Sequence, residues 1–378
     1  MAKIIVLGVG RVGRAIALDL ARTHDVTAAD RDAAALRSLA GAHGLGTRRV
    51  DLSDAARVRE AVAGFDLVVC AVPGFMGFAT LRAVLEAGRD VVDISFFPEN
   101  ALDLDALAKE RGVTAVVDVG VAPGMDNLIL GYHDARMTVE TFECLVGGLP
   151  KRRVWPFAYK APFSPVDVIE EYTRPARYVE NGHVVVKPAL SDPEFVAFDA
   201  VGTLEAFNTD GLRSLLFTMA HIPNMKEKTL RYPGHVRLIQ ALRASGFFAE
   251  EPIRVGDAEV SPRAFTSAVL FDVWRLDPDE DEFTVMRVTV AGTEDGRPKT
   301  YVYHLHDERD PATGFSSMAR TTGFTAAAAA HLVLDGRFTE KGVFPPELVG
   351  RTDGCFAFVR DYLAARNVIY RREVREGE

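Results

Sequence analysis

Cysteine is scarce in this sequence, and the few cysteines do not form a recognisable site. Cys70, Cys144 and Cys355 are the only three among 378 residues, and none lies in a Cys-x-x-Cys arrangement. An odd, dispersed set of thiols argues against disulfides and against a zinc site. His304 and His306 alternate along an expected strand, but no acidic or thiol ligand completes a metal-binding spacing around them. We therefore expect neither a disulfide nor a metal.

Positive charge is also in deficit, and long apolar runs are missing. Lysine and arginine total 44 against 53 aspartates and glutamates, which gives a net charge of −9. Such a chain lacks the basic surface that nucleic-acid binding requires. No apolar run approaches the roughly 20 residues needed to cross a bilayer, and the first residues enter a strand where a secretory signal would stand. We expect a cytoplasmic protein with neither nucleic acid nor a membrane as a partner.

The most informative feature that is present is a glycine-rich turn between an apolar strand and a helix. Residues 3–7 are β-branched and apolar, and residues 8–13 read Gly-Val-Gly-Arg-Val-Gly before apolar side chains recur at helical spacing. Gly8 permits a tight turn, Gly10 lets the backbone approach a pyrophosphate, and Gly13 allows the helix to pack closely on the strand. The helix N-terminus adds backbone donors and a positive dipole. This pattern predicts a dinucleotide site.

An acidic residue closes the next expected strand. Asp30 lies 22 residues after Gly8, where a carboxylate accepts hydrogen bonds from both ribose hydroxyls and repels a 2′-phosphate. NAD is therefore favoured over NADP, although Arg31 weakens that preference slightly. The residues predicted to bind NAD are Gly8, Gly10, Arg11, Val12, Gly13, Asp30, Arg31, Asp51, Cys70, Ala71, Val72 and Pro73.

The order of strands and helices predicts an α/β fold with a Rossmann-type, doubly wound parallel sheet. Strand candidates lie at residues 3–7, 24–30, 48–51, 67–73, 90–94 and 113–119. The alanine-rich residues 320–334 and residues 355–365 are expected to return as helices, with a possible strand at 368–370, against this sheet. The predicted NAD-binding domain is residues 1–124 plus 318–378.

From about residue 138 the pattern changes to alternation with period two and few helices. Further strand candidates are residues 184–187, 194–198, 282–291 and 300–306, and helix candidates are residues 212–219 and 236–245. An antiparallel or mixed sheet fits this spacing. Residues 125–317 are therefore expected to form an inserted α+β domain.

Several separated segments resemble the saccharopine dehydrogenase family. They are residues 8–13, 92–97 (Val-Asp-Ile-Ser-Phe-Phe), 120–126 (Gly-Val-Ala-Pro-Gly-Met-Asp), 147–150 (Gly-Gly-Leu-Pro) and 229–235 (Thr-Leu-Arg-Tyr-Pro-Gly-His), so the resemblance spans nearly the whole chain. Residues 207–215 and the compact length look most like the lysine 6-dehydrogenases. Saccharopine reductases generally show an Asn-Arg-Asp-Ser type sequence where Thr209-Asp210-Gly211 stands here, which favours a smaller amino acid as the substrate.

The resemblance implies a substrate-binding and dimerisation domain inserted into the Rossmann domain, and hydride transfer from a carbon that bears an amine. We expect NAD-dependent oxidative deamination of L-lysine at its ε-carbon, giving 2-aminoadipate 6-semialdehyde and ammonia, by a homodimer or higher homo-oligomer. One alternative is a saccharopine or carboxyspermidine-type dehydrogenase acting on a secondary amine. Its second carboxylate would need another cation, from Arg177, Arg231 or Lys160. The other alternative is a non-catalytic, NAD-binding regulatory protein.

Such chemistry needs a cation for a carboxylate, a carboxylate for an ammonium, and a base. Arg213 is the expected clamp for the α-carboxylate, with a surface position as the alternative. Asp210 or Asp126 is expected to bind the α-ammonium, with helix capping equally open for both.

A base is expected from one of two places. Residues 155–165, rich in aromatics and prolines, predict a rigid pocket wall in which Lys160 serves as a base, binds a carboxylate or extends to solvent. His235 opens a helix, where imidazole suits proton transfer near neutrality. The predicted catalytic residues are His235, Lys160 and Asp126, and the predicted substrate-binding residues are Arg213, Asp210, Thr209 and Tyr159.

Overall fold

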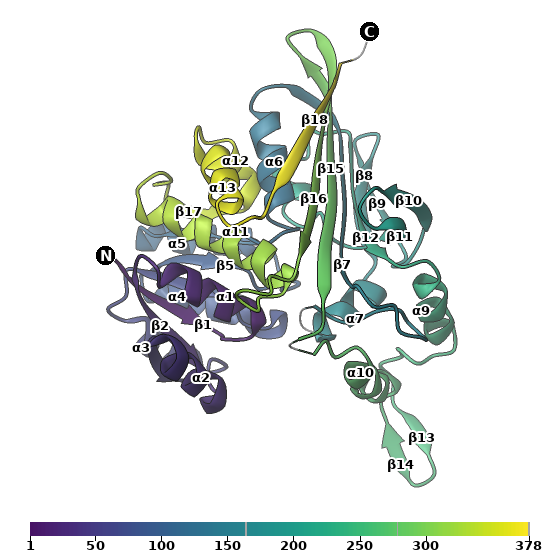
Figure 1. Cartoon of the computed structure of the whole chain (residues 1–378), viewed down its shortest axis with the longest axis horizontal. Helices are drawn as coiled ribbons and strands as arrows, with labels where there is room; N and C mark the ends of the chain where they lie inside the picture. Colours follow the sequence, from purple (N-terminus) through teal and green to yellow (C-terminus); the bar gives the residue numbers. More distant parts are fainter. Residues whose placement is uncertain (163–164, 278, 377–378) are drawn as a thin grey trace.

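The computed structural model describes residues 1–162, 165–277 and 279–376, and its core is formed around two large sheets (Figure 1). Within these residues, no helix combines the length and the apolar character that crossing a membrane requires.

The first sheet has seven parallel strands in the order β17-β6-β5-β4-β1-β2-β3. The strands are β1 (Lys3–Leu7), β2 (Asp25–Asp30), β3 (Gly46–Arg49), β4 (Leu67–Cys70), β5 (Asp90–Asp93), β6 (Thr114–Val116) and β17 (Gly342–Phe344). The first six follow the Rossmann order, which reverses between β1 and β4 and opens a crevice at their carboxyl ends. The predicted α/β Rossmann-type sheet is confirmed.

Helices cover both faces of this sheet. They are α1 (Arg11–Leu20), α2 (Ala33–His43), α3 (Ala55–Val62), α4 (Gly74–Glu86), the short 3-10 helix η1 (Ala101–Leu104), α5 (Asp105–Arg111), α11 (Ser317–Leu334), α12 (Pro346–Gly350) and α13 (Cys355–Ala364). Asp32 and Asp54 begin α2 and α3 by accepting hydrogen bonds from first-turn backbone N–H groups. The alanine-rich α11 packs against α1 as expected, because Gly323 brings its backbone close to Val12 and Ile16.

The second sheet has nine strands and is mixed. Its main path runs β10-β11-β12-β7-β15-β16-β18, and β8 pairs with β12 and with β9. The strands are β7 (Thr138–Pro150), β8 (Ala176–Glu180), β9 (His183–Lys187), β10 (Glu194–Phe198), β11 (Gly202–Asn208), β12 (Asn224–Arg231), β15 (Glu282–Glu294), β16 (Arg297–Glu308) and β18 (Tyr370–Glu376). Only the β12–β7 pair is parallel among these described pairings.

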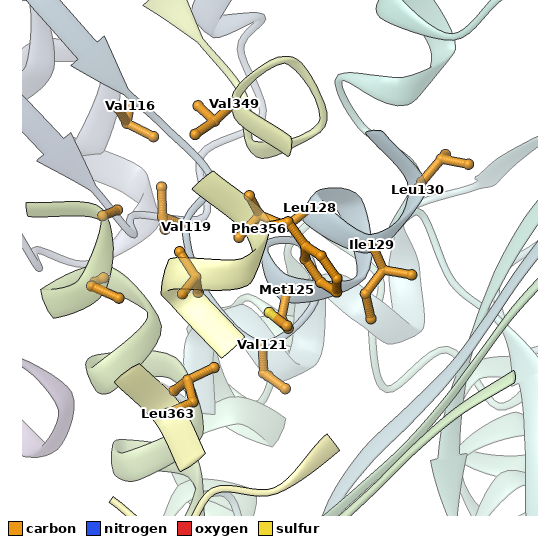
Figure 2. Packing of buried hydrophobic residues seen from close by; sticks show 14 of the residues in the cluster. Val116, Val119, Val121, Met125, Leu128, Ile129, Leu130, Val349, Phe356 and Leu363 are labelled. Atoms are coloured by element: carbon orange, nitrogen blue, oxygen red, sulfur yellow. The ribbon is translucent and has the colours of Figure 1, made fainter. Parts of the chain in front are cut away.

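The remaining elements surround this sheet. They are α6 (Met125–Asp134), α7 (Pro165–Thr173), α8 (Leu215–Thr218), α9 (His235–Ala244), α10 (Pro262–Val273) and the hairpin β13 (Ile253–Val255) with β14 (Ala258–Val260), which projects away from the body (Figure 1). Helix α6 joins the two sheets through a shared apolar core. Figure 2 shows Phe356 of α13 among Met125, Leu128 and Ile129 of α6.

The fold differs from the sequence-based expectations at several elements, including strands β8 and β11 and helices α7 and α10, and two of the differences are informative. The last strand, β18, pairs with β16 in the second sheet and does not lie in the nucleotide sheet. Strand β12 was not anticipated, because its residues include asparagine, lysine and glutamate, which are depleted in strands. That strand proves to carry part of the candidate site.

Candidate active site

A cavity of about 640 Å³ is lined by residues of both sheets. Its volume lies within the range of about 300–1,000 Å³ that is usual for ligand sites. The crevice end of the first sheet contributes one part of the lining. Strands β7 and β12, helix α7 and residues 209–211 contribute the other part.

The glycine turn has the geometry that a bound pyrophosphate requires. Gly8 has φ +92°, and a Cβ atom there would lie 2.4 Å from the Ala71 carbonyl oxygen. A Cβ atom at Gly13 would lie 2.0 Å from the Gly8 oxygen, so this glycine permits close packing of α1. Gly10 borders the cavity, and a Cβ atom there would point into open space. The turn therefore leaves room for a ligand at the N-terminus of α1, where backbone donors favour an anion.

Asp30 ends β2 at the rim of the same cavity. One carboxylate oxygen, Oδ2, accepts the Val9 N–H at 2.8 Å, and Oδ1 accepts the Asp32 N–H at 2.9 Å. These two hydrogen bonds connect Asp30 to the glycine turn and to the start of α2, and Asp30 also lines the cavity. Eleven of the predicted cofactor residues line the cavity: Gly8, Gly10, Arg11, Val12, Gly13, Asp30, Arg31, Asp51, Ala71, Val72 and Pro73.

Cys70 was predicted to bind NAD, but the structure places it outside the cavity. It ends β4 but is fully buried in the core between the sheet and its helices, and it does not line the cavity. Burial raises the pKa of its thiol. Alternation along the strand turns this side chain away from the crevice.

Arg213 also differs from its predicted role as a carboxylate clamp. Its guanidinium donates to both carboxylate oxygens of Asp118 at 2.9–3.1 Å and to the Phe97 carbonyl oxygen at 2.7 Å. Arg213 is buried and is not part of the cavity lining, whereas Asp118 is. Because the guanidinium binds Asp118, it is not available to bind a substrate carboxylate. It instead holds Asp118 in the cavity lining.

His235 lies behind the cavity wall and does not face it. Its Nδ1 donates to the Phe157 carbonyl oxygen at 3.0 Å, so its Nε2 accepts from the Tyr172 hydroxyl at 2.9 Å. Burial lowers the pKa of His235 to about 3. Both ring nitrogens are occupied by neighbours, which removes His235 as the base. Tyr159 is likewise buried outside the lining, where its hydroxyl accepts from Arg231 at 3.3 Å.

Lys160 does not reach the cavity either. Its ammonium donates to the carbonyl oxygen of Val273 at 3.1 Å, at the C-terminus of α10, a position that favours a cation. Phe163 and Ser164 of the same predicted loop lie outside the described residues.

Asp126 is brought close to the site but not into its lining. It lies in the first turn of α6, where Gly124 is the N-cap residue, and its carboxylate is fully buried. The Cys144 thiol and the backbone N–H groups of Gly124 and Asn127 interact with the carboxylate, but burial outweighs them and raises the pKa of Asp126.

Thr209 and Asp210 do line the cavity. The Thr209 hydroxyl lies 2.9 Å from that of Thr229, and Asp210 binds the Arg177 guanidinium at 2.9 Å. Arg177 thus neutralises Asp210 and is not available as a free clamp.

The sequence reasoning missed most of the wall opposite the glycine turn. Glu227, Thr229 and Arg231 alternate along β12 and all line the cavity, while Glu170, Glu171 and Arg174 come from α7 and the residue after it. The period-two spacing of residues 227–231 was the available signal. We call Glu170, Glu171, Asp210 and Glu227 the acidic wall.

Three carboxylates of the acidic wall are paired with arginines. Arg231 binds Glu171 at 2.8 Å, Arg177 binds Asp210, and Glu170 lies 3.5 Å from Arg174. Glu227 forms no ion pair among the described residues, and its Oε2 has no hydrogen-bond partner there. Burial raises the pKa of Glu227, and the negative charge of Asp126 is the second largest cause of the same rise. Within the described part of the chain, no cluster of histidine, cysteine, aspartate or glutamate is arranged to hold a metal.

Comparisons with known proteins match this chain over nearly its whole length. Residues 4–116 match the family model described as the saccharopine dehydrogenase NADP binding domain, and residues 120–366 match the saccharopine dehydrogenase C-terminal domain. A similar curated protein is carboxyaminopropylagmatine dehydrogenase of Synechocystis sp., which is 24% identical over 92% of each chain.

Solved structures agree on the fold. Apo saccharopine dehydrogenase (L-Glu forming) from Saccharomyces cerevisiae superposes with a TM-score of 0.80 at 20% identity, covering 99% of this chain and 100% of that one. The homospermidine synthase of Legionella pneumophila, solved in complex with NAD, gives a TM-score of 0.69 at 12% identity, covering 100% of this chain and 91% of that one.

Proposed function

The chain belongs to the saccharopine dehydrogenase family, and from this premise we propose that it oxidises the ε-carbon of L-lysine with NAD. Its family makes it a nicotinamide-dependent dehydrogenase of amines or amino acids. The choice of lysine and of NAD is our inference from the site. The overall reaction converts R–CH₂–NH₃⁺, NAD⁺ and water into R–CHO, NH₄⁺, NADH and one proton.

The observation that carries the choice of substrate is the charge pairing of the acidic wall. Arg174 and Arg231, the arginines that line the wall opposite the glycine turn, already face Glu170 and Glu171, whereas Glu227 has no ion pair among the described residues. A buried, unpaired carboxylate favours a ligand that brings a positive charge. L-lysine brings two ammonium groups and one carboxylate. Saccharopine brings three carboxylates, for which this wall offers no uncompensated cation.

The chain's own residues would hold the dinucleotide through the glycine turn and Asp30. The turn supplies backbone donors to the pyrophosphate, and the nicotinamide accepts a hydride when the cofactor is bound. Asp30 supports NAD over NADP, because its carboxylate faces the cavity at the end of β2 and would repel a 2′-phosphate. Arg31 lines the cavity beside it and reduces that discrimination.

A second candidate substrate is a secondary amine that also carries a net positive charge. The Synechocystis relative is named for such a compound, carboxyaminopropylagmatine, and it matches this chain over 92% of both lengths. The cationic guanidinium of that compound would suit the same acidic wall.

We also infer that the protein is a homodimer or a higher homo-oligomer. Exposed apolar side chains gather on α10 and the adjacent hairpin, including Phe265, Val269, Ile253 and Val255. Light scattering of the purified protein tests this, and a monomeric mass would contradict it.

The function is tested by following NADH formation by the purified protein with a panel of amines. The panel contains L-lysine, L-ornithine, diamines, saccharopine and carboxyaminopropylagmatine, each assayed with NAD and with NADP. We expect turnover of L-lysine, with an aldehyde that an amine reagent traps and with release of ammonia. Turnover of none of these amines with either cofactor would refute the proposal.

A further inference from the structure

Glu227 is part of the cavity wall, and the chain at Gly211 packs directly against its carboxyl group. Glu227 lines the cavity although it is only 6% exposed. Gly211 lies directly against it, since a Cβ atom at position 211 would be 2.1 Å from both Cδ and Oε1 of Glu227. Any larger residue at 211 would displace the carboxyl group. Gly211 therefore packs against one side of the Glu227 carboxyl group, while Glu227 also borders the cavity.

A second buried carboxylate lies behind this wall. Cys144 of β7 is the register partner of Glu227 on β12, so their side chains share one face of the sheet. Asp126 reaches the same region from α6, which packs on β7, and it interacts with both the Cys144 thiol and Glu227. Among the described residues, Oε2 of Glu227 has no hydrogen-bond partner. Two buried carboxylates whose charges interact cannot both be ionised without a large cost.

We propose that Glu227 is the catalytic residue that takes the proton from the substrate ammonium, and that Asp126 is a positioning residue that sets when Glu227 is ionised. This assignment rests on the proposed amine oxidation. In the step, one N–H bond of R–CH₂–NH₃⁺ breaks and the proton goes to a carboxylate oxygen of Glu227, while the electron pair stays on nitrogen. That pair forms the C=N bond as the C–H bond breaks and its hydrogen leaves with two electrons for NAD⁺. Water then adds to the carbon, ammonium departs, and Glu227 releases its proton to solvent.

The surroundings of Glu227 make it a stronger proton acceptor than an ordinary carboxylate. Among the described residues, five titratable or charged groups on the surrounding elements interact with it: Asp126 of α6, Cys144 of β7, Glu171 of α7, Asp210, and Arg213. Burial and three of these carboxylates raise the pKa of Glu227, and Arg213 opposes them. A base whose pKa lies nearer the working pH accepts a proton more effectively than an ordinary carboxylate.

Steady-state kinetics over a range of pH test the roles of both residues. Glu227→Gln should lower kcat by about 100-fold or more, the usual contribution of a positioned acid or base, and Glu227→Asp should recover part of the loss. Asp126→Asn removes a neighbouring negative charge, so the rise of kcat/KM with pH should move to lower pH while most of kcat remains. A Glu227→Gln enzyme with wild-type kcat would overturn the role of Glu227, and an unmoved profile in Asp126→Asn would overturn that of Asp126.

Glu143→Gln is the matched control. Glu143 lies on β7 next to Cys144 but on the opposite face, where it pairs with Lys226 at 2.9 Å outside the cavity lining. The same carboxyl-to-amide change there should leave both kcat and the pH profile unchanged. An equal loss in this variant would show that the effect at Glu227 is not specific.

A measurement without substrate separates this inference from the proposed function. Burial also raises the pKa of Glu282 and Glu347, so the resonances must be assigned. In protein labelled with ¹³C at the glutamate carboxyls, the resonance assigned to Glu227 should titrate well above the ordinary range. It should be missing in Glu227→Gln and should shift to lower pH in Asp126→Asn. If Glu227 titrates normally, the inference fails even when lysine is oxidised. If the resonance behaves as expected but no amine is oxidised, the proposed function fails instead.

Discussion

Arg213 binds both carboxylate oxygens of Asp118, and this buried pair connects the segment after β6 to the segment before α8. The contacts from Nε and Nη2 measure 2.9–3.1 Å, and both side chains are less than a tenth exposed. Both residues also have positive φ, +55° for Asp118 and +45° for Arg213. Such backbone conformations cost about 1 kcal/mol or more each, so the ion pair compensates for local strain. The pair fixes the position of Asp118 in the cavity lining.

Removing this pair should destabilise the fold. Arg213→Ala leaves the buried Asp118 carboxylate without its partner, so we expect the free energy of unfolding to fall by about 3–5 kcal/mol. Urea denaturation measures the change. The control is Arg59→Ala, which breaks the more exposed Arg59–Glu86 pair and should cost less than about 1 kcal/mol. Equal losses in the two variants would contradict the account of the Asp118 pair.

The glycine turn predicts opposite effects at two neighbouring glycines. Gly10→Ala adds a methyl group to open cavity space, so the KM for NAD should rise several-fold while stability stays within about 0.5 kcal/mol of the wild type. Gly13→Ala places Cβ against the Gly8 carbonyl oxygen and should cost about 1–3 kcal/mol through overpacking. Thermal unfolding and NAD titration distinguish the two variants. Normal NAD binding by a stable Gly10→Ala protein would place the pyrophosphate elsewhere.

Asp30 is expected to control cofactor choice. Asp30→Ala removes the ribose acceptor and also the hydrogen bond to the Val9 N–H, so the KM for NAD should rise at least several-fold. The ratio of kcat/KM for NADP to that for NAD should increase in the same variant, because the carboxylate no longer repels a 2′-phosphate. Steady-state kinetics with both cofactors provide the measurement. An unchanged KM for NAD would mean that the ribose carboxylate is misassigned.

Asp93 should make stability depend on pH. Burial raises its pKa to about 7, whereas in the unfolded chain it titrates near about 4. The folded state therefore holds this proton more tightly, so the stabilisation is fully present below about pH 4 and is lost as the pH rises to about 7. Asp93→Asn removes this titration but keeps an oxygen that can accept the Ser95 N–H. Relative to the wild type, the variant should gain stability between pH 5 and pH 8, which urea denaturation at each pH would measure. A difference in the free energy of unfolding that stays the same at every pH would disprove the raised pKa of Asp93.

The nucleotide half of the site was predictable from sequence because its signal is local. Residues 8–13 and Asp30 follow one another along a single strand-turn-helix-strand unit, and the structure places them around one cavity. The substrate half is assembled from segments that are distant in sequence. Arg213 and His235 have the right chemistry, but buried partners, Asp118 and Tyr172, occupy their polar atoms. Burial and pairing of this kind depend on tertiary contacts, which residue type and spacing do not reveal.

Glu227 was not predicted as a site residue because its strand could not be recognised from composition. Its strand reads Asn-Met-Lys-Glu-Lys-Thr-Leu-Arg, a composition that does not favour a strand, although alternate residues share one face. Only the pairing of β12 with β7 and β11 brings Glu227 to the cavity and sets Asp126 behind it.

The charge selectivity of the cavity is measured by comparing kcat/KM for L-lysine and for saccharopine side by side, with NAD and the wild-type enzyme. The acidic wall predicts that L-lysine is preferred by at least about tenfold, a difference of about 1.4 kcal/mol in transition-state binding. The product should be 2-aminoadipate 6-semialdehyde with one ammonia released per NADH. A preference for saccharopine, with its three carboxylates, would show that this cavity does not select a cationic amine.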